Sequence, residues 1–289
     1  MSKKTAEKKK SLGFFPILLL LIFILSLGAC IYLAYGEVNK EIGIKDMEED
    51  IQTYMKPQMA ANPAAEQEDD GSDIEVEPED AYVFDWEGML EQSPYVVGWI
   101  QVPGLERINY PIVQHPDDNQ FFLTHDWKGA KQSAGAIFMN RYNAKDFTDM
   151  NTVIYGHRMK AGSMFGLLKK YEDQAFMDEH PYFYIYTPDG QKLTYEIICC
   201  SYVTDGSDAY LQHFNSPDER MAYYDMMLHP VSKGKGCITK RDVELDRLDS
   251  TVMLSTCNKS GSGYYDRTVI LGKLTAVDIN GQPENWDTE

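Results

Sequence analysis

The chain has 289 residues, enough for one large domain or two small ones, and a formal net charge of −18. Because no basic stripe is present to neutralise phosphates, this composition argues against nucleic acid as a partner. The cysteines show no regular spacing that would predict a disulfide framework, and no CxxC or HExxH pattern predicts a metal site.

A basic tail, residues 1–13, precedes an apolar segment at 14–36. About 20 apolar residues cross a bilayer as a helix, so the segment is long enough to be a transmembrane helix. Lysines clustered before it predict a cytoplasmic N-terminus and an extracellular remainder. The alternative is a cleaved signal, because "LGAC" at Leu27–Cys30 resembles a lipoprotein processing box with Cys30 as the lipidated residue. The apolar run continues past Cys30, which favours the uncleaved anchor.

Residues 37–80 are expected to form an acidic extracellular stalk. The part from 61 to 80 carries nine acidic and no basic residues. Its few apolar side chains cannot offset the entropy of ordering the chain, which predicts disorder.

The remainder, 81–289, is long enough to bury a sizeable core and is expected to be a single catalytic domain. Its β-like runs are rich in Val, Ile, Tyr, Phe and Thr and end at Gly, Pro, Asn or Asp. Short strands of this kind joined by turns predict a mainly β fold, a barrel or a sandwich. The runs cover 98–103, 108–114, 135–140, 151–157, 182–187, 192–203, 251–257 and 267–277.

Three helices are expected around these strands. The first is "FDWEGMLEQSP", which Pro94 ends, and the second is "SMFGLLKKYEDQAFMDEH" with Ser163 as its cap. The third, "SPDERMAYYDMMLHP", has Ser216 as cap, Pro217 in the first turn and Glu219 completing a capping box.

Two strand ends carry residues suited to chemistry. Alternation along "TVMLSTC" puts Cys257 at the end of a strand beside a loop, and Arg267 opens the next run. If these strands are neighbours, the two side chains face one cleft. His157 ends another run, "NTVIYGH". A lone cysteine in such a place is most often a packing residue, so the pattern alone does not settle its role.

The three side chains together fit acyl transfer from a peptide bond. A cysteine nucleophile needs a cationic partner to become a thiolate. The leaving amine needs an acid, and the developing oxyanion needs a donor. Histidine and arginine are suitable for those two tasks.

The sequence from about 84 to 277 resembles the sortases, membrane-anchored cysteine transpeptidases of Gram-positive bacteria. The resemblance is carried by "YGHRM", by the "MLSTC" box and by the arginine ten positions after the cysteine, with support from "VVGWIQVPG" and "GSMFGLL". It is most similar to class B. Met253 departs from the family, which usually has Thr there, and Asn258 stands where class B often has an acidic residue.

The resemblance implies a closed eight-stranded β-barrel, with an N-terminal helix and a further helix in the long loop between strands six and seven. It implies His157, Cys257 and Arg267 as catalytic residues, and no cofactor or metal. The positions that match the family's substrate groove are Asn119, Tyr155, Tyr210, Leu211, Ser255 and Thr256.

The implied partners are secreted proteins bearing a C-terminal sorting signal, with a cell-wall precursor amine or a pilin amine as acceptor. Two alternatives remain at this stage. An L,D-transpeptidase also uses a barrel-borne cysteine, but resembles "SHGC" followed closely by Arg, which "LSTCNKS" lacks. A non-enzymatic surface-binding module would keep Cys257 buried and unreactive.

Overall fold

The computed structural model describes residues 14–57, 82–229, 237–257, 267–279 and 282–283. It divides into two compact units, Met1–Asp46 and Met47–Glu289. The boundary falls inside the first helix, α1 (Phe14–Gln52), so the last residues of this helix belong to the same unit as the strands. By length and composition α1 is apolar enough to cross a membrane.

The structure describes residues 37–57, the first part of the expected acidic stalk. Residues 37–52 continue α1, and β1 (Met55–Pro57) pairs with β2 (Tyr82–Phe84) in a two-stranded antiparallel sheet. Met47 and Ile51, one helical turn apart, are both buried, with Ile51 only 2% exposed. These apolar residues give the end of the helix a buried face, although most of the surrounding residues are polar or acidic. Residues 58–80 of the expected stalk lie outside the described residues.

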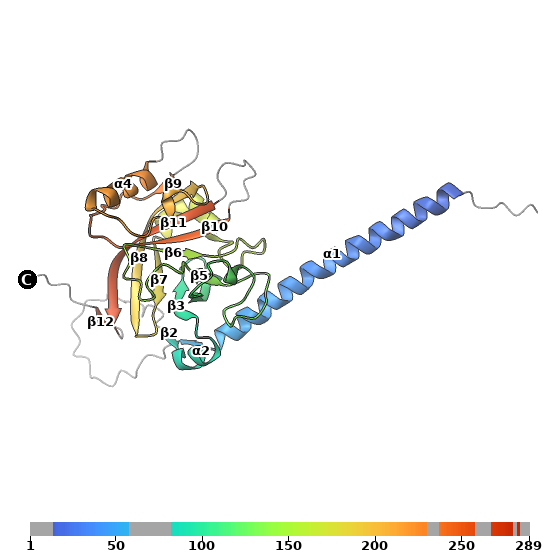
Figure 1. Ribbon diagram of the computed structural model, residues 1–289, viewed down its shortest axis with the longest axis horizontal. Coiled ribbons are helices and arrows are strands. Elements are labelled where there is room, and N and C mark those ends of the chain that lie inside the picture. Colours follow the sequence, from blue (N-terminus) through green and yellow to red (C-terminus); the bar gives the residue numbers. More distant parts are fainter. Residues whose placement is uncertain (1–13, 58–81, 230–236, 258–266, 280–281, 284–289) are drawn as a thin grey trace, which may run out of the picture. The chain divides into compact units, whose positions relative to one another are not determined.

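Eight strands close into a barrel (Figure 1). Around the barrel the order is β11–β10–β6–β5–β4–β3–β7–β8, and pairing of β8 with β11 closes it. All eight predicted runs are strands, and the predicted eight-stranded closed barrel is confirmed. The strands are β3 (Val96–Gln101), β4 (Asn109–Val113), β5 (Ile137–Met139), β6 (Asn151–Tyr155), β7 (Tyr182–Tyr186), β8 (Gln191–Val203), β10 (Thr251–Cys257) and β11 (Arg267–Ile279). Two further strands, β9 (Cys237–Lys240) and β12 (Gln282–Pro283), pair with β8 and β11.

Two of the predicted helices are also confirmed. The helix α2 (Trp86–Gln92) precedes the barrel, and Asp85 caps it by accepting from the Gly88 amide. The helix α4 (Pro217–Leu228) lies in the connection between β8 and β10, the sixth and seventh barrel strands, and Ser216 caps it. The carboxylate of Glu219 accepts from the Asn215 amide, one residue earlier than in the predicted capping box.

The predicted helix over 163–180 is wrong in its first half. The structure has a 3₁₀ turn, η2 (Leu168–Glu172), and a short helix, α3 (Gln174–Glu179), capped by Asp173. Ser163 caps nothing, because the next residue, Met164, has a left-handed backbone with φ of 53°. Two more 3₁₀ turns are η1 (Phe121–Leu123) and η3 (Asp208–Tyr210).

Both faces of β10 are buried along most of its length, from Thr251 to Thr256. One face packs into a cluster formed with α4, and this cluster contains Met253, Tyr223 and Tyr224. Because successive side chains of a strand alternate, the other face, with Val252 and Leu254, lies on the opposite side of the sheet. Only the last residue of the strand, Cys257, is partly exposed.

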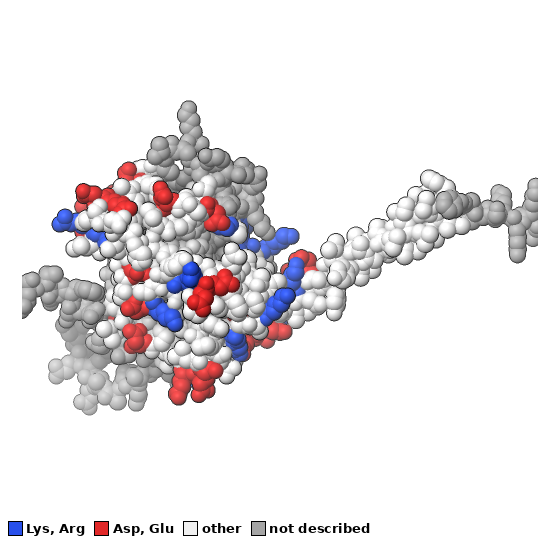
Figure 2. All heavy atoms as spheres, in the orientation of Figure 1, with Lys and Arg blue, Asp and Glu red and all other residues white. Residues whose placement is uncertain are grey.

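On the face of the barrel shown in Figure 2, acidic and basic side chains are interspersed. The described residues on this face form no continuous basic stripe.

Candidate active site

The ends of three neighbouring strands form the candidate site. In the antiparallel pair β10–β11, Cys257 lies opposite Arg267. In the parallel pair β6–β10, Ser255 lies opposite Tyr155, and the Gly156 amide donates to the Ser255 carbonyl at 3.1 Å. The parallel register ends at this pair, and His157 and Cys257 each follow it by two residues along the chain. Neighbouring strands lie about 4.8 Å apart, so the ends of β6, β10 and β11 are neighbours at one end of the barrel.

Cys257 and Arg267 are in direct contact. Nη1 of Arg267 donates to Sγ of Cys257 at 3.3 Å, and Nη2 of the same guanidinium lies 2.7 Å from Oδ2 of Asp205. The Arg267 side chain is 25% exposed, whereas that of Asp205 is 60% exposed. The guanidinium therefore bridges the thiol and a carboxylate near solvent. A donor in this position stabilises a thiolate and can also serve an oxyanion that forms beside the sulfur.

The imidazole of His157 is held by the backbone of a loop between β4 and β5. Its Nε2 lies 2.8 Å from the Leu123 carbonyl oxygen. Gly135, with φ of 64°, lies beside the imidazole: a Cβ atom there would come within 2.2 Å of the Phe122 carbonyl oxygen and 3.2 Å of the His157 ring, so this turn of the loop requires glycine. A histidine that is partly exposed and fixed by one ring nitrogen can exchange protons with a bound reactant.

Most of the predicted substrate-groove residues belong to one polar and aromatic network. The Asn119 amide donates to Asn140 at 3.2 Å, and Asn140 donates to the Tyr155 hydroxyl at 3.1 Å. The rings of Tyr155 and Tyr210 stack with centroids 6.0 Å apart. The Tyr210 hydroxyl is 2.8 Å from the Ser255 hydroxyl, two residues before Cys257 on the same strand face.

Burial keeps this network uncharged. Burial raises the pKa of Tyr155, although the hydrogen bond from Asn140 opposes this shift. Burial likewise raises the pKa of Tyr210. Both phenols therefore remain protonated at neutral pH and can act as hydrogen-bond donors.

Two predicted groove residues are placed differently. The Thr256 side chain is buried on the face of β10 opposite Cys257, and its hydroxyl has no hydrogen-bond partner among the described residues. Leu211 is 36% exposed, and its carbonyl accepts from Asn151 at 2.7 Å. No described contact joins either side chain to Cys257.

Sequence reasoning missed two residues of the site, Asp205 and Asn140. Asp205 follows β8 and reaches Arg267 from 62 residues away. Asn140 follows β5 and links Asn119 to Tyr155. Asn140 is the last residue of the predicted run 135–140 and Asp205 comes two residues after the run 192–203, so a polar residue at the end of a predicted strand is a weak signal that could have drawn attention to both.

The other cysteines of the barrel are buried or partly buried. Cys199 and Cys200 are fully buried, and burial raises the pKa of Cys199 to about 12. Burial also raises the pKa of Cys200 and of Cys237. Over the described residues no group of three or more His, Cys, Asp or Glu side chains is arranged to hold a metal ion.

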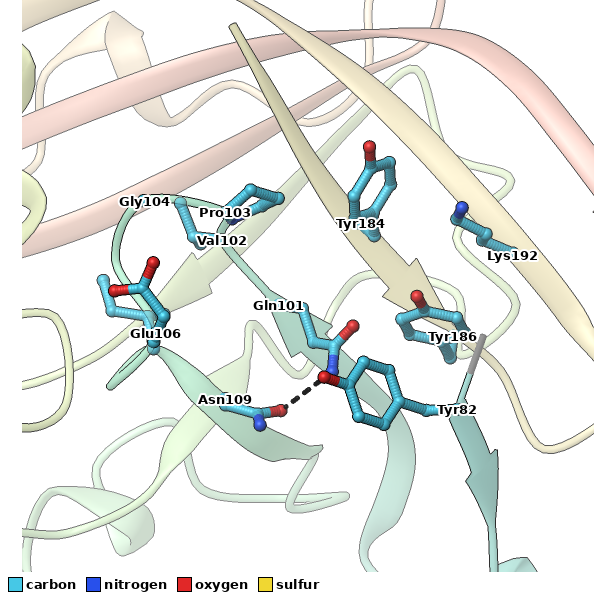
Figure 3. Close-up of a pocket in the computed structure, with 11 residues that line it drawn as sticks. Tyr82, Gln101, Val102, Pro103, Gly104, Glu106, Asn109, Tyr184, Tyr186 and Lys192 are labelled. Carbon is cyan, nitrogen blue, oxygen red and sulfur yellow. Dashed lines mark hydrogen bonds between the residues drawn. The ribbon is translucent and has the colours of Figure 1, made fainter. Parts of the chain in front are cut away.

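The structure also has a cavity of about 400 Å³, and Figure 3 shows the residues that line it. Tyr184, Tyr186 and Lys192 line it, together with Gln101 and Asn109, which share a hydrogen bond. In the β8–β11 register Lys192 lies opposite Asp278, which is 11 residues beyond Arg267 along β11. At about 3.3 Å per residue the cavity is roughly 35 Å along the strand from the thiol, and none of the predicted site residues lines it.

Comparison with known proteins identifies the fold. A family model described as the sortase domain matches residues 100–275. Sortase B of Listeria monocytogenes is 34% identical over 179 residues, which cover 62% of this chain and 69% of that protein. Sortase B of Staphylococcus aureus is 29% identical over 194 residues, covering 66% and 75%.

Solved structures agree. Sortase B from Bacillus anthracis in complex with AAEK1 aligns with a TM-score of 0.63 at 25% identity, over 83% of this chain and 99% of that one. The Staphylococcus aureus sortase B–substrate complex aligns with a TM-score of 0.57 at 25% identity, over 66% and 84%. The barrel is thus that of a cysteine transpeptidase. The chain belongs to the sortase family, and its relatives place it in class B.

Proposed function

We propose that the enzyme cleaves a C-terminal sorting motif of secreted proteins with Cys257 as the nucleophile. The Cys257 sulfur attacks the carbonyl carbon of the motif's threonine, the peptide C–N bond breaks, and a thioester joins the substrate to the enzyme. His157 protonates the departing amine. An amine of a cell-wall precursor or of a pilin then attacks the thioester, forms a new amide and releases the thiol.

The contact of 3.3 Å between Nη1 of Arg267 and Sγ of Cys257 is the observation that carries this proposal. A guanidinium at that distance stabilises the thiolate before attack. During attack, negative charge moves from sulfur to the carbonyl oxygen, and the same guanidinium can then donate a hydrogen bond to this oxyanion. The β6–β10 register ends two residues before His157 and two residues before Cys257, which supports His157 as the acid.

The sorting motif would lie along the network of Asn119, Tyr155, Tyr210 and Ser255. Neutral hydroxyl and amide groups of this kind bind a peptide backbone, and the stacked tyrosine rings offer an apolar wall. We still propose that Thr256 and Leu211 contact the substrate in this groove, Thr256 through its backbone only.

We further propose that the N-terminus is cytoplasmic and that α1 anchors a catalytic domain outside the cell. The lysines before α1 support this orientation. A sortase in this orientation meets its substrates as they leave the membrane.

A peptide library tests the function. The full chain in detergent micelles is incubated with fluorescence-quenched peptides that contain threonine and are randomised on both sides of it, with hydroxylamine as the acceptor. We expect cleavage after threonine in a restricted set of sequences, a hydroxamate product, and no cleavage by Cys257→Ala. Cleavage by Cys257→Ala at the wild-type rate would show that the assignment is wrong. Cys200→Ala is the matched control, because its thiol is buried on another strand.

A further inference from the structure

The end of α1 contacts the barrel through an acidic side chain, Glu48. This residue lies in the same compact unit as the strands, and its side chain is 25% exposed. The Tyr110 hydroxyl donates to Oε1 of Glu48 at 2.6 Å. Nη2 of Arg107 lies 3.2 Å from both carboxylate oxygens. One carboxylate therefore fixes two side chains beside β4.

Both of these side chains also hold the loop that follows His157. The Tyr110 hydroxyl accepts from the Met164 amide at 3.2 Å. Nη1 of Arg107 donates to the Ala161 carbonyl at 2.6 Å. Glu48 is thus connected to two separate points of the loop 158–165, in each case through one intervening side chain.

This loop folds back on itself, and its last residue contacts the backbone of His157. Arg158 and Met164 form an antiparallel bridge, and the Phe165 amide donates to the His157 carbonyl at 3.0 Å. The Phe165 ring packs on Gly156, where a Cβ atom would be only 2.7 Å from it. The backbone on both sides of the imidazole therefore depends on where Met164 and Phe165 lie.

Met164 needs this support because its backbone is strained. A non-glycine residue with φ of 53° persists only where its surroundings hold it. Tyrosine has a single O–H proton, and donation of that proton to Glu48 directs the lone pairs of Tyr110 toward the Met164 amide. Burial, reinforced by the hydrogen bond to Glu48, raises the pKa of Tyr110, so the proton stays in place.

We propose that Glu48 is a positioning residue for His157, acting through Tyr110 on Met164 and through Arg107 on Ala161. The proposal rests on the proposed function, in which His157 is the proton donor. It gives the C-terminal end of α1 a part in catalysis beyond tethering. An enzyme whose helix end is detached from β4 would bind its substrate normally and turn it over slowly.

The test uses the full chain in detergent micelles, with two variants and a matched control. Glu48→Gln removes the ion pair with Arg107, and Tyr110→Phe removes the hydroxyl that accepts from Met164. Asp50→Asn is the control, because Asp50 is an acidic residue on the same helix end whose ion pair, 2.8 Å from Lys128, involves neither Arg107 nor Tyr110.

Hydrogen exchange measures the loop without any substrate. The Met164 and Phe165 amides should exchange about tenfold faster in Tyr110→Phe, because loss of the hydrogen bond weakens local closure. Glu48→Gln should show a smaller increase in the same direction, and Asp50→Asn should match the wild type. Wild-type exchange at both amides in Glu48→Gln and Tyr110→Phe would overturn the proposal, whatever the activity.

Kinetics with the best peptide from the library supply the second readout, with active sites counted by thiol titration. We expect kcat to fall roughly tenfold in Tyr110→Phe with KM within twofold of the wild type, since small displacements of a catalytic group cost this much or more. A faster-exchanging loop with unchanged kcat would also overturn the proposal. Failure of the wild type to cleave any peptide would instead contradict the proposed function, and the exchange data would still decide whether Glu48 holds the loop.

Discussion

The guanidinium of Arg267 contacts the thiol of Cys257 at 3.3 Å across a pair of antiparallel strands. The same group reaches Asp205, so its position is fixed from two sides. This bridge allows the proposed catalytic role of the arginine to be tested against a purely structural one.

Replacement of Arg267 by lysine should cost about 100- to 1000-fold in kcat, the usual effect of removing one oxyanion donor. Lysine keeps the charge but cannot contact Sγ and the Asp205 carboxylate at once with a planar fork. Steady-state kinetics with the library peptide measure the effect, and circular dichroism checks the fold. A near-normal kcat in a folded Arg267→Lys enzyme would leave the arginine with only a structural role.

Removal of the carboxylate should have a much smaller effect. The Asp205 side chain is 60% exposed, so its ion pair is worth at most about 1 kcal/mol, or roughly fivefold. We expect Asp205→Asn to lower kcat by no more than this, and to reduce the salt dependence of kcat, since screening acts on the pair. A loss as large as that of Arg267→Lys would mean that Asp205 takes a direct part in the reaction.

Cys257 should be the only barrel thiol among Cys199, Cys200 and Cys257 that a methyl-thiosulfonate reagent modifies rapidly at pH 8. Cys199 is fully buried, and burial raises its pKa so far that the thiol stays protonated at that pH. Peptide mapping by mass spectrometry after short exposure gives the rates. Equal modification of Cys199 in the native protein would contradict the burial described here.

Stability should fall in alkaline solution. Burial raises the pKa of Cys199 from 9.0 to about 12, so the folded state keeps the proton that the unfolded chain releases. The resulting stabilisation is complete below pH 9 and is lost as the pH rises from 9 to 12. Urea midpoints at pH 8, 9.5 and 10.5 should decrease, and Cys199→Ala should reduce the decrease. Midpoints that stay constant over this range would be inconsistent with a buried neutral thiol.

The strands of the barrel could be predicted because each is a local pattern. β-branched and aromatic residues between turn formers located all eight barrel strands, and alternation within "TVMLSTC" placed Cys257 at an open strand end. The helix α4 was equally local, since Ser216 and Pro217 mark its start.

What could not be predicted depends on contacts between distant residues. Asp205 meets Arg267, and Glu48 meets Tyr110, each across 62 residues, and neither pair leaves a periodic signal. The helix expected from Ser163 failed for a related reason. Tertiary contacts to Met164 stabilise a backbone conformation that overrides the helical periodicity of that segment.

The alternation of β10 also makes the site an indicator of strand register. Because side chains change face at every residue, a slip of β10 by one position would turn the sulfur of Cys257 to the opposite side of the sheet and bring Thr256 to the solvent end. Cys257, the proposed nucleophile, would then face away from Arg267. We therefore expect a barrel closed one residue out of register to be inactive even where its strands are all paired.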